Sequence, residues 1–383
     1  ISLNKDGTTL AVGAYNNSSY TTGAGQVRIY RYSNSNWTLQ KTINGSNSNG
    51  YFGWALSLND SGNMLIIGEP RYSSYRGRAY VYRYTTDWNN IKTFNYTSST
   101  TYGYYGETVD INGEGNIVCI GGNGNYSGSS DKGYIDVYKW NNGTDFSTGS
   151  YVALGGRFIG STNEKLGYNV SLNNAGTRIA FSYEHGVGRT TTYGEIAMWD
   201  IADPIYKTQT ITIGDDISGN DASFNNIYLT GTTFFAGDVS GNDASFNHIG
   251  IAHLRGRNKL TWGEFKNAWS KMDDNIAGLD NNDYFGESIS FNYSGDRVVV
   301  GIPGEDEDGN NKGQVRVYKY VNETWVQSGN TIIGETNNEE FGSAVDINGA
   351  GDTIIVGAPE SDKHGSNRGC LLYTSDAADD TPV

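Results

Sequence analysis

The sequence predicts an all-β fold, a β-propeller of seven four-stranded antiparallel blades. A unit of about 55 residues recurs along the 383-residue chain, and Gly-bearing turns separate several short strands in each unit. Only 36% of the residues are hydrophobic, while 52 are Gly and 28 are Tyr. A fixed period of this size indicates stacked supersecondary units, and four strands per unit make a propeller blade.

Each unit begins with an aromatic residue and Gly, and the strands follow in a constant order. The unit at Phe285 reads FGESISFNYSGDRVVVGIPGEDEDGNNKGQVRVYKY, and the unit at Phe52 is similar. Ile289 and Phe291 alternate with polar residues before the turn, and Val298 to Val300 form a continuous apolar run after it. This pattern predicts a half-covered first strand and a fully buried second strand. An aromatic-rich third strand and a fourth strand near a Trp complete the unit.

The blade count depends on one long gap between the glycines of the first turns. These glycines are Gly7, Gly62, Gly115, Gly176, Gly295 and Gly351. Gly176 and Gly295 are about two periods apart, and the segment GTTFFAG around Gly231 parallels GTTLAVG at Gly7, which favours a degenerate seventh unit. The octapeptide SGNDASFN, however, occurs at 218–225 and again at 240–247, which favours an inserted hairpin or a β-solenoid coil. We therefore expect six strong units, plus a degenerate blade or an insert at about 214–258.

The two ends of the chain lead us to expect a propeller truncated at both ends, in a single domain over 1–369. The chain opens at ISLN, inside the first strand of a unit. The stretch CLLYTSDAADDTPV fits no repeat position, and residues 369–383 resemble a translated linker artefact. We interpret 370–383 as a non-native tail and exclude it from the fold.

Composition limits the classes of partner. A net charge of −15 argues against nucleic acid, because binding to phosphates needs clustered Lys and Arg. No apolar run is long enough to span a bilayer, so we expect no membrane insertion by this fragment. Cys119 occupies a position where other units place Ala11 or Ile66, which predicts a buried core thiol.

The joint spacing of two motifs resembles the FG-GAP repeat of integrin α-subunit-type β-propellers, in its prokaryotic, algal and large-virus versions. Phe341–Gly342 is followed by Gly357-Ala358-Pro359, and Phe285–Gly286 by a similar Gly-Ile-Pro. The resemblance covers residues 1 to about 213 and about 274 to 369. It implies an extracellular, cell-surface or virion-surface propeller that binds a protein or a glycan without catalysis. The SGNDASFN insert is similar to short repeats in surface and structural proteins of large DNA viruses and marine phages.

The resemblance also raises the question of calcium, because FG-GAP blades often carry a calcium loop after the first strand. The best match is Asp110, Asn112 and Glu114, but Val118 stands at the final acidic position and the loop is one residue short. A metal-free turn held by Asx hydrogen bonds is the alternative. The acidic loop Glu305, Asp306, Glu307 and Asp308 is a second candidate, with screening by solvent as its alternative. We expect no required cofactor, and Ca²⁺ at these two loops is the alternative.

The loops between the strands supply the candidate ligand contacts. We expect the binding loops at 69–77, 123–133 and 304–313, where Tyr72, Tyr75, Tyr126, Glu305 and Glu307 are the candidate contact residues. No catalytic motif is present, and the four histidines show no metal-ligand pairing, so we predict that the chain is not an enzyme. The competing hypotheses are a structural component of a virion or multidomain surface protein, and a propeller hydrolase with carboxylates at the channel mouth.

Overall fold

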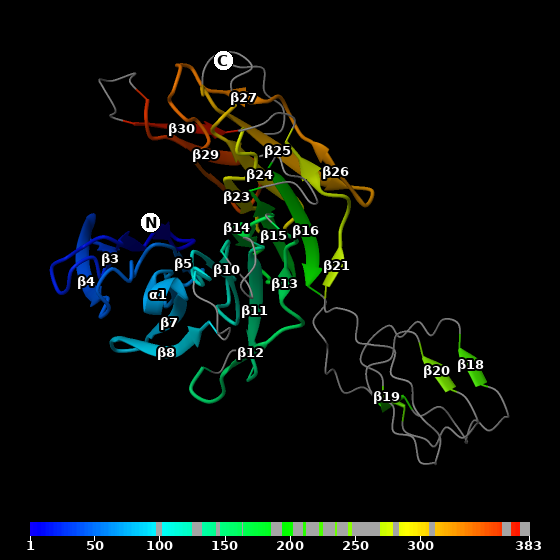
Figure 1. Cartoon of the computed structure of the whole chain (residues 1–383), viewed down its shortest axis with the longest axis horizontal. Helices are drawn as coiled ribbons and strands as arrows, with labels where there is room; N and C mark the ends of the chain where they lie inside the picture. Colours follow the sequence, from blue (N-terminus) through cyan, green and yellow to red (C-terminus); the bar gives the residue numbers. More distant parts are fainter. Residues whose placement is uncertain are drawn as a thin grey trace. The chain divides into compact units, whose positions relative to one another are not determined.

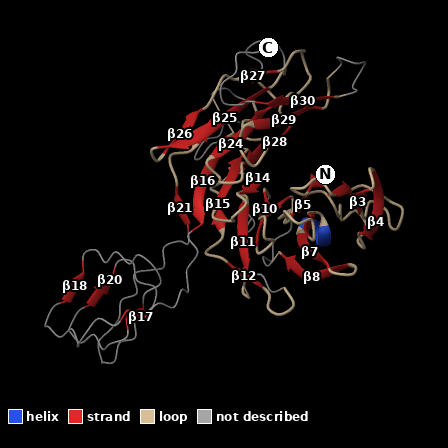
Figure 2. Cartoon of the chain, turned by 180° about the vertical axis from the view of Figure 1, so that it is seen from behind, coloured by secondary structure: helices blue, strands red, loops and turns tan. Residues whose placement is uncertain are grey.

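Six antiparallel sheets, here called blades 1 to 6, make up the larger of two units in the computed structural model (Figure 1). The structure describes residues 1–96, 102–124, 132–142, 146–162, 164–184, 194–201, 271–278, 283–305, 311–361 and 369–375, together with five short strands between 202 and 270. Strands dominate each blade, as Figure 2 shows. The chain is therefore a β-propeller with four-stranded antiparallel blades, as the repeat predicted.

The first three blades are each built from consecutive strands. Blade 1 contains β1 (Ser2–Leu3), β2 (Thr9–Ala14), β3 (Gln26–Ser33) and β4 (Asn36–Asn44). Blade 2 contains β5 (Leu56–Leu58), β6 (Met64–Glu69), β7 (Arg78–Tyr84) and β8 (Trp88–Asn95), with the short helical turn α1 (Tyr72–Tyr75) between β6 and β7. Blade 3 contains β9 (Thr108–Ile111), β10 (Ile117–Gly122), β11 (Tyr134–Trp140), β12 (Tyr151–Ala153) and β13 (Phe158–Ile159).

The last three blades follow the same order, except that the strands of blade 4 are not consecutive and blade 6 has only three described strands. Blade 4 contains β14 (Leu166–Leu172), β15 (Arg178–Tyr183), β16 (Glu195–Ile201), β21 (Trp269–Lys271) and β22 (Ile276–Ala277). Blade 5 contains β23 (Ser288–Phe291), β24 (Arg297–Ile302), β25 (Gln314–Val321), β26 (Thr324–Gln327) and β27 (Ile332–Ile333). Blade 6 has three strands, β28 (Ala344–Ile347), β29 (Thr353–Ala358) and β30 (Cys370–Ser375).

The prediction of seven blades is wrong, since the described residues form six. The third and fourth strands of blade 4, β16 and β21, are separated by residues 202–268. The long gap between Gly176 and Gly295 therefore comes from a segment inserted inside one blade. A count of turn spacings cannot distinguish that insertion from a weak additional unit, because both add about one period.

The smaller unit, Ile201–Ser270, shows a different kind of pairing. β18 (Ala222–Phe224) pairs in parallel with β20 (Ala244–Phe246), and β17 (Thr210–Ile211) pairs in parallel with β19 (Phe234–Phe235). Each residue of the first SGNDASFN strand therefore pairs with the same residue of the second copy. Parallel, in-register pairing is typical of solenoid coils and not of a propeller blade.

Neighbouring blades meet at two glycines, which explains the recurrence of both motifs. A Cβ atom on Gly68, in the second strand of blade 2, would lie 1.8 Å from the carbonyl oxygen of Gly106 in blade 3. Gly13 stands in the same relation to Gly53, and Gly301 to Gly342. The glycine after the aromatic residue also has positive φ, +89° at Gly106. Only glycine permits both this backbone conformation and this close approach.

The apolar core lies between successive blades. Phe52 and Tyr80 pack in one buried cluster, Tyr105 and Tyr134 in the next, and Phe285 with Tyr318 in a third. Cys119 is fully buried in β10, which confirms that it is a core thiol. Within the described residues, no helix has the length and apolarity needed to cross a membrane.

Residues 370–375, which the sequence pattern left outside the fold, pair with β29. Six consecutive pairs run from Ala358–Cys370 to Thr353–Ser375, in the register that other blades give to their third strand. Gly369 has the positive φ found at Gly25, Gly77, Gly133 and Gly313, each of which directly precedes a third strand. The non-native origin of 370–383 remains a prediction.

Candidate functional site

The two ends of each blade differ in their loops. We call the end where the first strand begins, beside the aromatic-Gly motif, the loop face, and the opposite end, with the tight turn after the first strand, the hairpin end. The loop face carries the connections from second to third strands and from one blade to the next. These connections are the longer and more varied in sequence, so this face holds the candidate site.

Six aromatic residues from blades 1 to 3 gather on the loop face, and we call them the loop-face aromatic cluster: Tyr15, Tyr51, Trp54, Tyr75, Tyr102 and Tyr104. The Tyr15 ring lies 4.7 Å from Trp54 and 5.2 Å from Tyr51, between ring centroids. Tyr75 stacks on Tyr102 with centroids 5.3 Å apart and also contacts Tyr104. The guanidinium of Arg71 joins the two groups, since it lies 4.0 Å from the centroid of Tyr51 and 5.7 Å from that of Tyr75.

The cluster is open to solvent and rests on an unusual backbone. Trp54 is 41% exposed and Tyr102 49% exposed. Tyr51, Tyr75, Tyr102 and Tyr104 all have positive φ, which costs free energy for a side chain of this size. Hydrogen bonds between loops hold two of them in place, from Tyr104 N to Tyr75 O (2.9 Å) and from Tyr51 N to Gly23 O (3.3 Å). The loops therefore hold the aromatic rings in a defined arrangement. Packing in a buried core does not explain this arrangement, because the exposed rings lie at the surface.

The structure places the tyrosines predicted as ligand contacts in different environments. Tyr75 belongs to the cluster, whereas the ring of Tyr72 is covered by the Arg78 guanidinium 3.5 Å from its centroid. Arg78 in turn pairs with the buried Glu69 at 2.7 Å, so Tyr72 supports the loop from within. Tyr126 lies outside the described residues.

Sequence reasoning missed four members of the cluster that flank the aromatic-Gly motifs: Tyr51, Trp54, Tyr102 and Tyr104. In both YFGW and YYGE an aromatic residue directly precedes the motif. This repeated aromatic position could have indicated additional candidate contact residues.

Acidic residues continue the loop face across blades 3 to 5. Glu107 directly follows the motif of blade 3, and its Oε2 atom is buried with no hydrogen-bond partner. Burial raises the pKa of Glu107 to about 7, and Glu184 adds to the effect. Burial also raises the pKa of Glu287, with Glu340 and Glu184 nearby. Lys165 neutralises part of this charge through an ion pair with Glu184 at 2.5 Å.

The raised pKa of Glu107 predicts a pH-dependent stability. Because the pKa in the folded state is above its unfolded value, the stabilisation from the protonated form is fully present below about pH 4.5 and is lost as the pH rises through about 7. Between these pH values, the free energy of unfolding of the wild type should fall by about 1 to 2 kcal/mol more than that of Glu107→Gln. Urea unfolding at several pH values measures it. Parallel curves for the two proteins would contradict it.

The best calcium match has its polar atoms engaged within the protein. Asp110 accepts hydrogen bonds from Ser57 Oγ in blade 2 (2.7 Å) and from Leu172 N in blade 4 (2.7 Å), so it ties three first strands together. Asn112 Oδ1 accepts from Ile117 N at 2.8 Å and caps its own turn. Glu114 is exposed and accepts from Asn116. The three side chains therefore serve separate contacts.

The acidic loop is only partly described. Glu305 is buried, and its carboxylate accepts a hydrogen bond from Gln314 Nε2. Asp306, Glu307 and Asp308 lie outside the described residues. Within the part of the chain that the structure describes, no three His, Cys, Asp or Glu residues are grouped so as to hold a metal ion.

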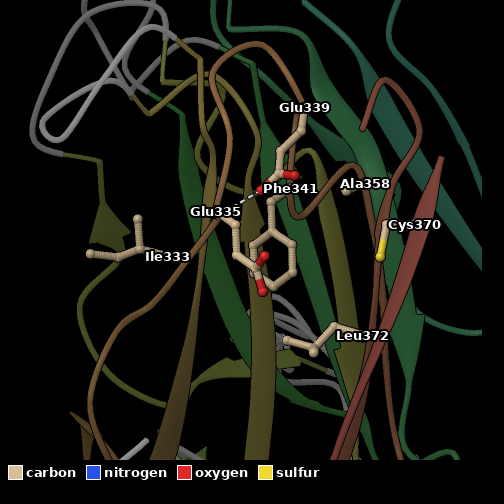
Figure 3. A pocket seen from close by; sticks show the side chains of 8 residues that line it. Ile333, Glu335, Glu339, Phe341, Ala358, Cys370 and Leu372 are labelled. Carbon is tan, nitrogen blue, oxygen red and sulfur yellow. Dashed lines mark hydrogen bonds between the residues drawn. The ribbon is translucent and has the colours of Figure 1, made fainter. Parts of the chain in front are cut away.

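A small hollow lies between blades 5 and 6, lined by Ile333, Phe341, Cys370 and Leu372 together with Glu335 and Glu339 (Figure 3). Glu339 accepts a hydrogen bond from the backbone N–H of Glu335 and is buried, so it belongs to the turn. The hollow measures about 80 Å³. Ligand pockets measure roughly 300–1,000 Å³, so this space is a packing gap beside β30.

The fold and the exposed loops define the class of this protein as a β-propeller. Among solved structures, the chain is similar to the crystal structure of TolB from Acinetobacter baumannii, with 14% identity and a TM-score of 0.32. The match covers 52% of this chain and 39% of that chain, so it spans well under half of TolB. No protein-family model and no curated protein sequence matches the chain.

Proposed function

We propose that this chain is a non-catalytic binding module that recognises a protein or a carbohydrate through the loop-face aromatic cluster. The propeller is of the FG-GAP type, and it works outside the cell, on a cell surface or on a virion surface. The resemblance of its repeats to that family supports both statements. No metal is required, because the turns are closed by their own Asn side chains, although the loops at Asp110 and at Glu305 to Asp308 are where Ca²⁺ would be sought.

One observation carries the proposal, namely the loop-face aromatic cluster, in which four of the six side chains are exposed to solvent. A soluble protein rarely exposes a contiguous aromatic surface unless it meets a ligand there. Tyr and Trp combine a large apolar face with a polar group, which suits contact with sugars and with protein surfaces. The positive φ of four of the six adds a second argument, since strained residues gather at ligand sites.

A structural role on a virion or surface protein is the competing function, and the parallel SGNDASFN pairing supports it. In that case contacts would run through the 201–270 unit and the outer blade edges. The variants described next distinguish this alternative, because they alter only the loop face.

Loss of aromatic surface is expected to abolish binding without unfolding the protein. A glycan and protein array with the wild-type chain identifies ligands, and Trp54→Ala with Tyr75→Ala should weaken binding to them by about 2 kcal/mol or more. Trp37→Ala is the matched control, because Trp37 is exposed to a similar degree, 38%, but lies on the outer strand β4. Equal binding by the double variant, or an array with no ligand, would contradict the proposal.

A further inference from the structure

A polar cleft lies at the hairpin end of blades 2 and 3, at the opposite end of β5 from the loop face. Its volume is about 360 Å³. Asp60, Asn63 and Arg83 of blade 2 line it, together with Glu114 and Phe146 of blade 3. This volume lies within the range of ligand pockets, roughly 300–1,000 Å³.

The notable residue of this cleft is Arg83, whose guanidinium has an aromatic neighbour but no hydrogen-bond acceptor among the described residues. Its side chain is half-buried, and its guanidinium lies 5.4 Å from the centroid of Phe146. Among the described residues, the guanidinium has no hydrogen-bond or ion-pair partner. Arg31 holds the equivalent position in blade 1, and it donates to the Gly62 carbonyl of the next blade at 3.5 Å. Because the side chain is only partly buried and no described residue accepts a hydrogen bond from it, the guanidinium is open to a ligand that brings acceptors.

The remaining polar side chains of the cleft are the carboxylates of Asp60 and Glu114 and the groups of Asn59, Ser61 and Asn63, which both donate and accept. Asp60 has Lys5 as its cation at 3.8 Å, a long and solvent-exposed contact. Glu114 is exposed and accepts from Asn116 at 2.8 Å. Each carboxylate can accept further hydrogen bonds, since two oxygens offer about four positions.

From this lining we propose that the cleft binds a sugar, that is, a neutral polyhydroxylated ring. Asp60 and Glu114 repel an anion, and Arg83 repels a cation. A sugar hydroxyl both accepts from the guanidinium and donates to the carboxylates, so it satisfies both kinds of group at once. Phe146, whose ring lies beside the guanidinium, supplies apolar surface that a sugar's C–H groups can contact. This site is separate from the loop face, so the inference does not depend on the proposed function.

Saturation-transfer NMR with glucose, galactose, mannose and N-acetylglucosamine, at about 10 mM each, tests the site at weak affinities. At least one sugar is expected to give a signal with the wild-type chain. Arg83→Gln and Phe146→Ala should weaken its binding at least tenfold. Arg31→Gln is the matched control, because Arg31 holds the equivalent position in blade 1, and it should bind the sugar as the wild type does.

Three results would overturn the inference: no signal from any of the four sugars, a signal that persists in both cleft variants, or binding of sulfate in place of the sugars. Near-UV circular dichroism establishes that each variant is folded. Since Arg83→Gln and Phe146→Ala remove different parts of the same cleft, a fold defect in one leaves the other as the test.

Discussion

Replacing Gly68 with Ala is expected to destabilise the protein by about 3 kcal/mol or more. The new Cβ would meet the Gly106 carbonyl oxygen at 1.8 Å, and that atom belongs to the backbone of the next blade. The Gly106 backbone is held in turn by a hydrogen bond from its own N–H to the Gly121 carbonyl (3.0 Å). The blades must therefore separate, because neither backbone can move alone.

Gly156→Ala is the matched control for Gly68→Ala. A Cβ at Gly156 meets no atom within 4 Å, so its free energy of unfolding should stay within about 0.5 kcal/mol of the wild type. Urea denaturation measures both variants. If Gly68→Ala proved as stable as Gly156→Ala, the close contact of neighbouring blades at these glycines would be wrong.

The second large effect is expected at Asp136, the centre of a buried ion pair in blade 3. Its carboxylate accepts from Arg157 Nε at 2.7 Å and from Arg157 Nη2 at 2.5 Å, and also from the Tyr138 hydroxyl. Asp136→Ala removes this carboxylate from the arginine charge, which lies near the rings of Tyr134 and Tyr96. Removing one member of a buried ion pair costs about 3–5 kcal/mol of unfolding free energy.

The exposed pair between Lys41 and Asp87 provides the comparison. Its nitrogen and oxygen are also 2.5 Å apart, but the Asp87 side chain is 56% exposed. Asp87→Ala should therefore lower the free energy of unfolding far less than Asp136→Ala does. Equal losses for the two aspartates would show that burial does not control the strength of these pairs.

The sequence predicted the blade but not the number of blades, and the reason is physical. The glycines after the aromatic residues and in the second strands are required by contacts between neighbouring blades, such as that of Gly68 with Gly106, so they recur and can be read. The segment 202–268 lies between two strands of one blade, and it adds about one period to the spacing of the turn glycines. Only strand pairing, β16 with β21 in one sheet, reveals that it interrupts blade 4.

The candidate site was predicted in part for a similar reason. Tyr75 was chosen because its loop is variable, and the structure places it in the aromatic cluster. Trp54 and Tyr104 directly adjoin the aromatic-Gly motifs, and the regular repeat gave no sign that their side chains form a cluster. The environment of Arg83 also could not be predicted, since the equivalent Arg31 has a similar sequence context and yet donates to a carbonyl of the next blade.

Hydrogen exchange on the protein bound to its strongest array ligand shows which face of the propeller meets that ligand. We expect slower exchange in the loop-face segments 45–55, 71–77 and 102–107, with the outer strands β4 and β8 unchanged. Protection confined to the outer strands or to the 201–270 unit would contradict a loop-face binding module and favour a structural role.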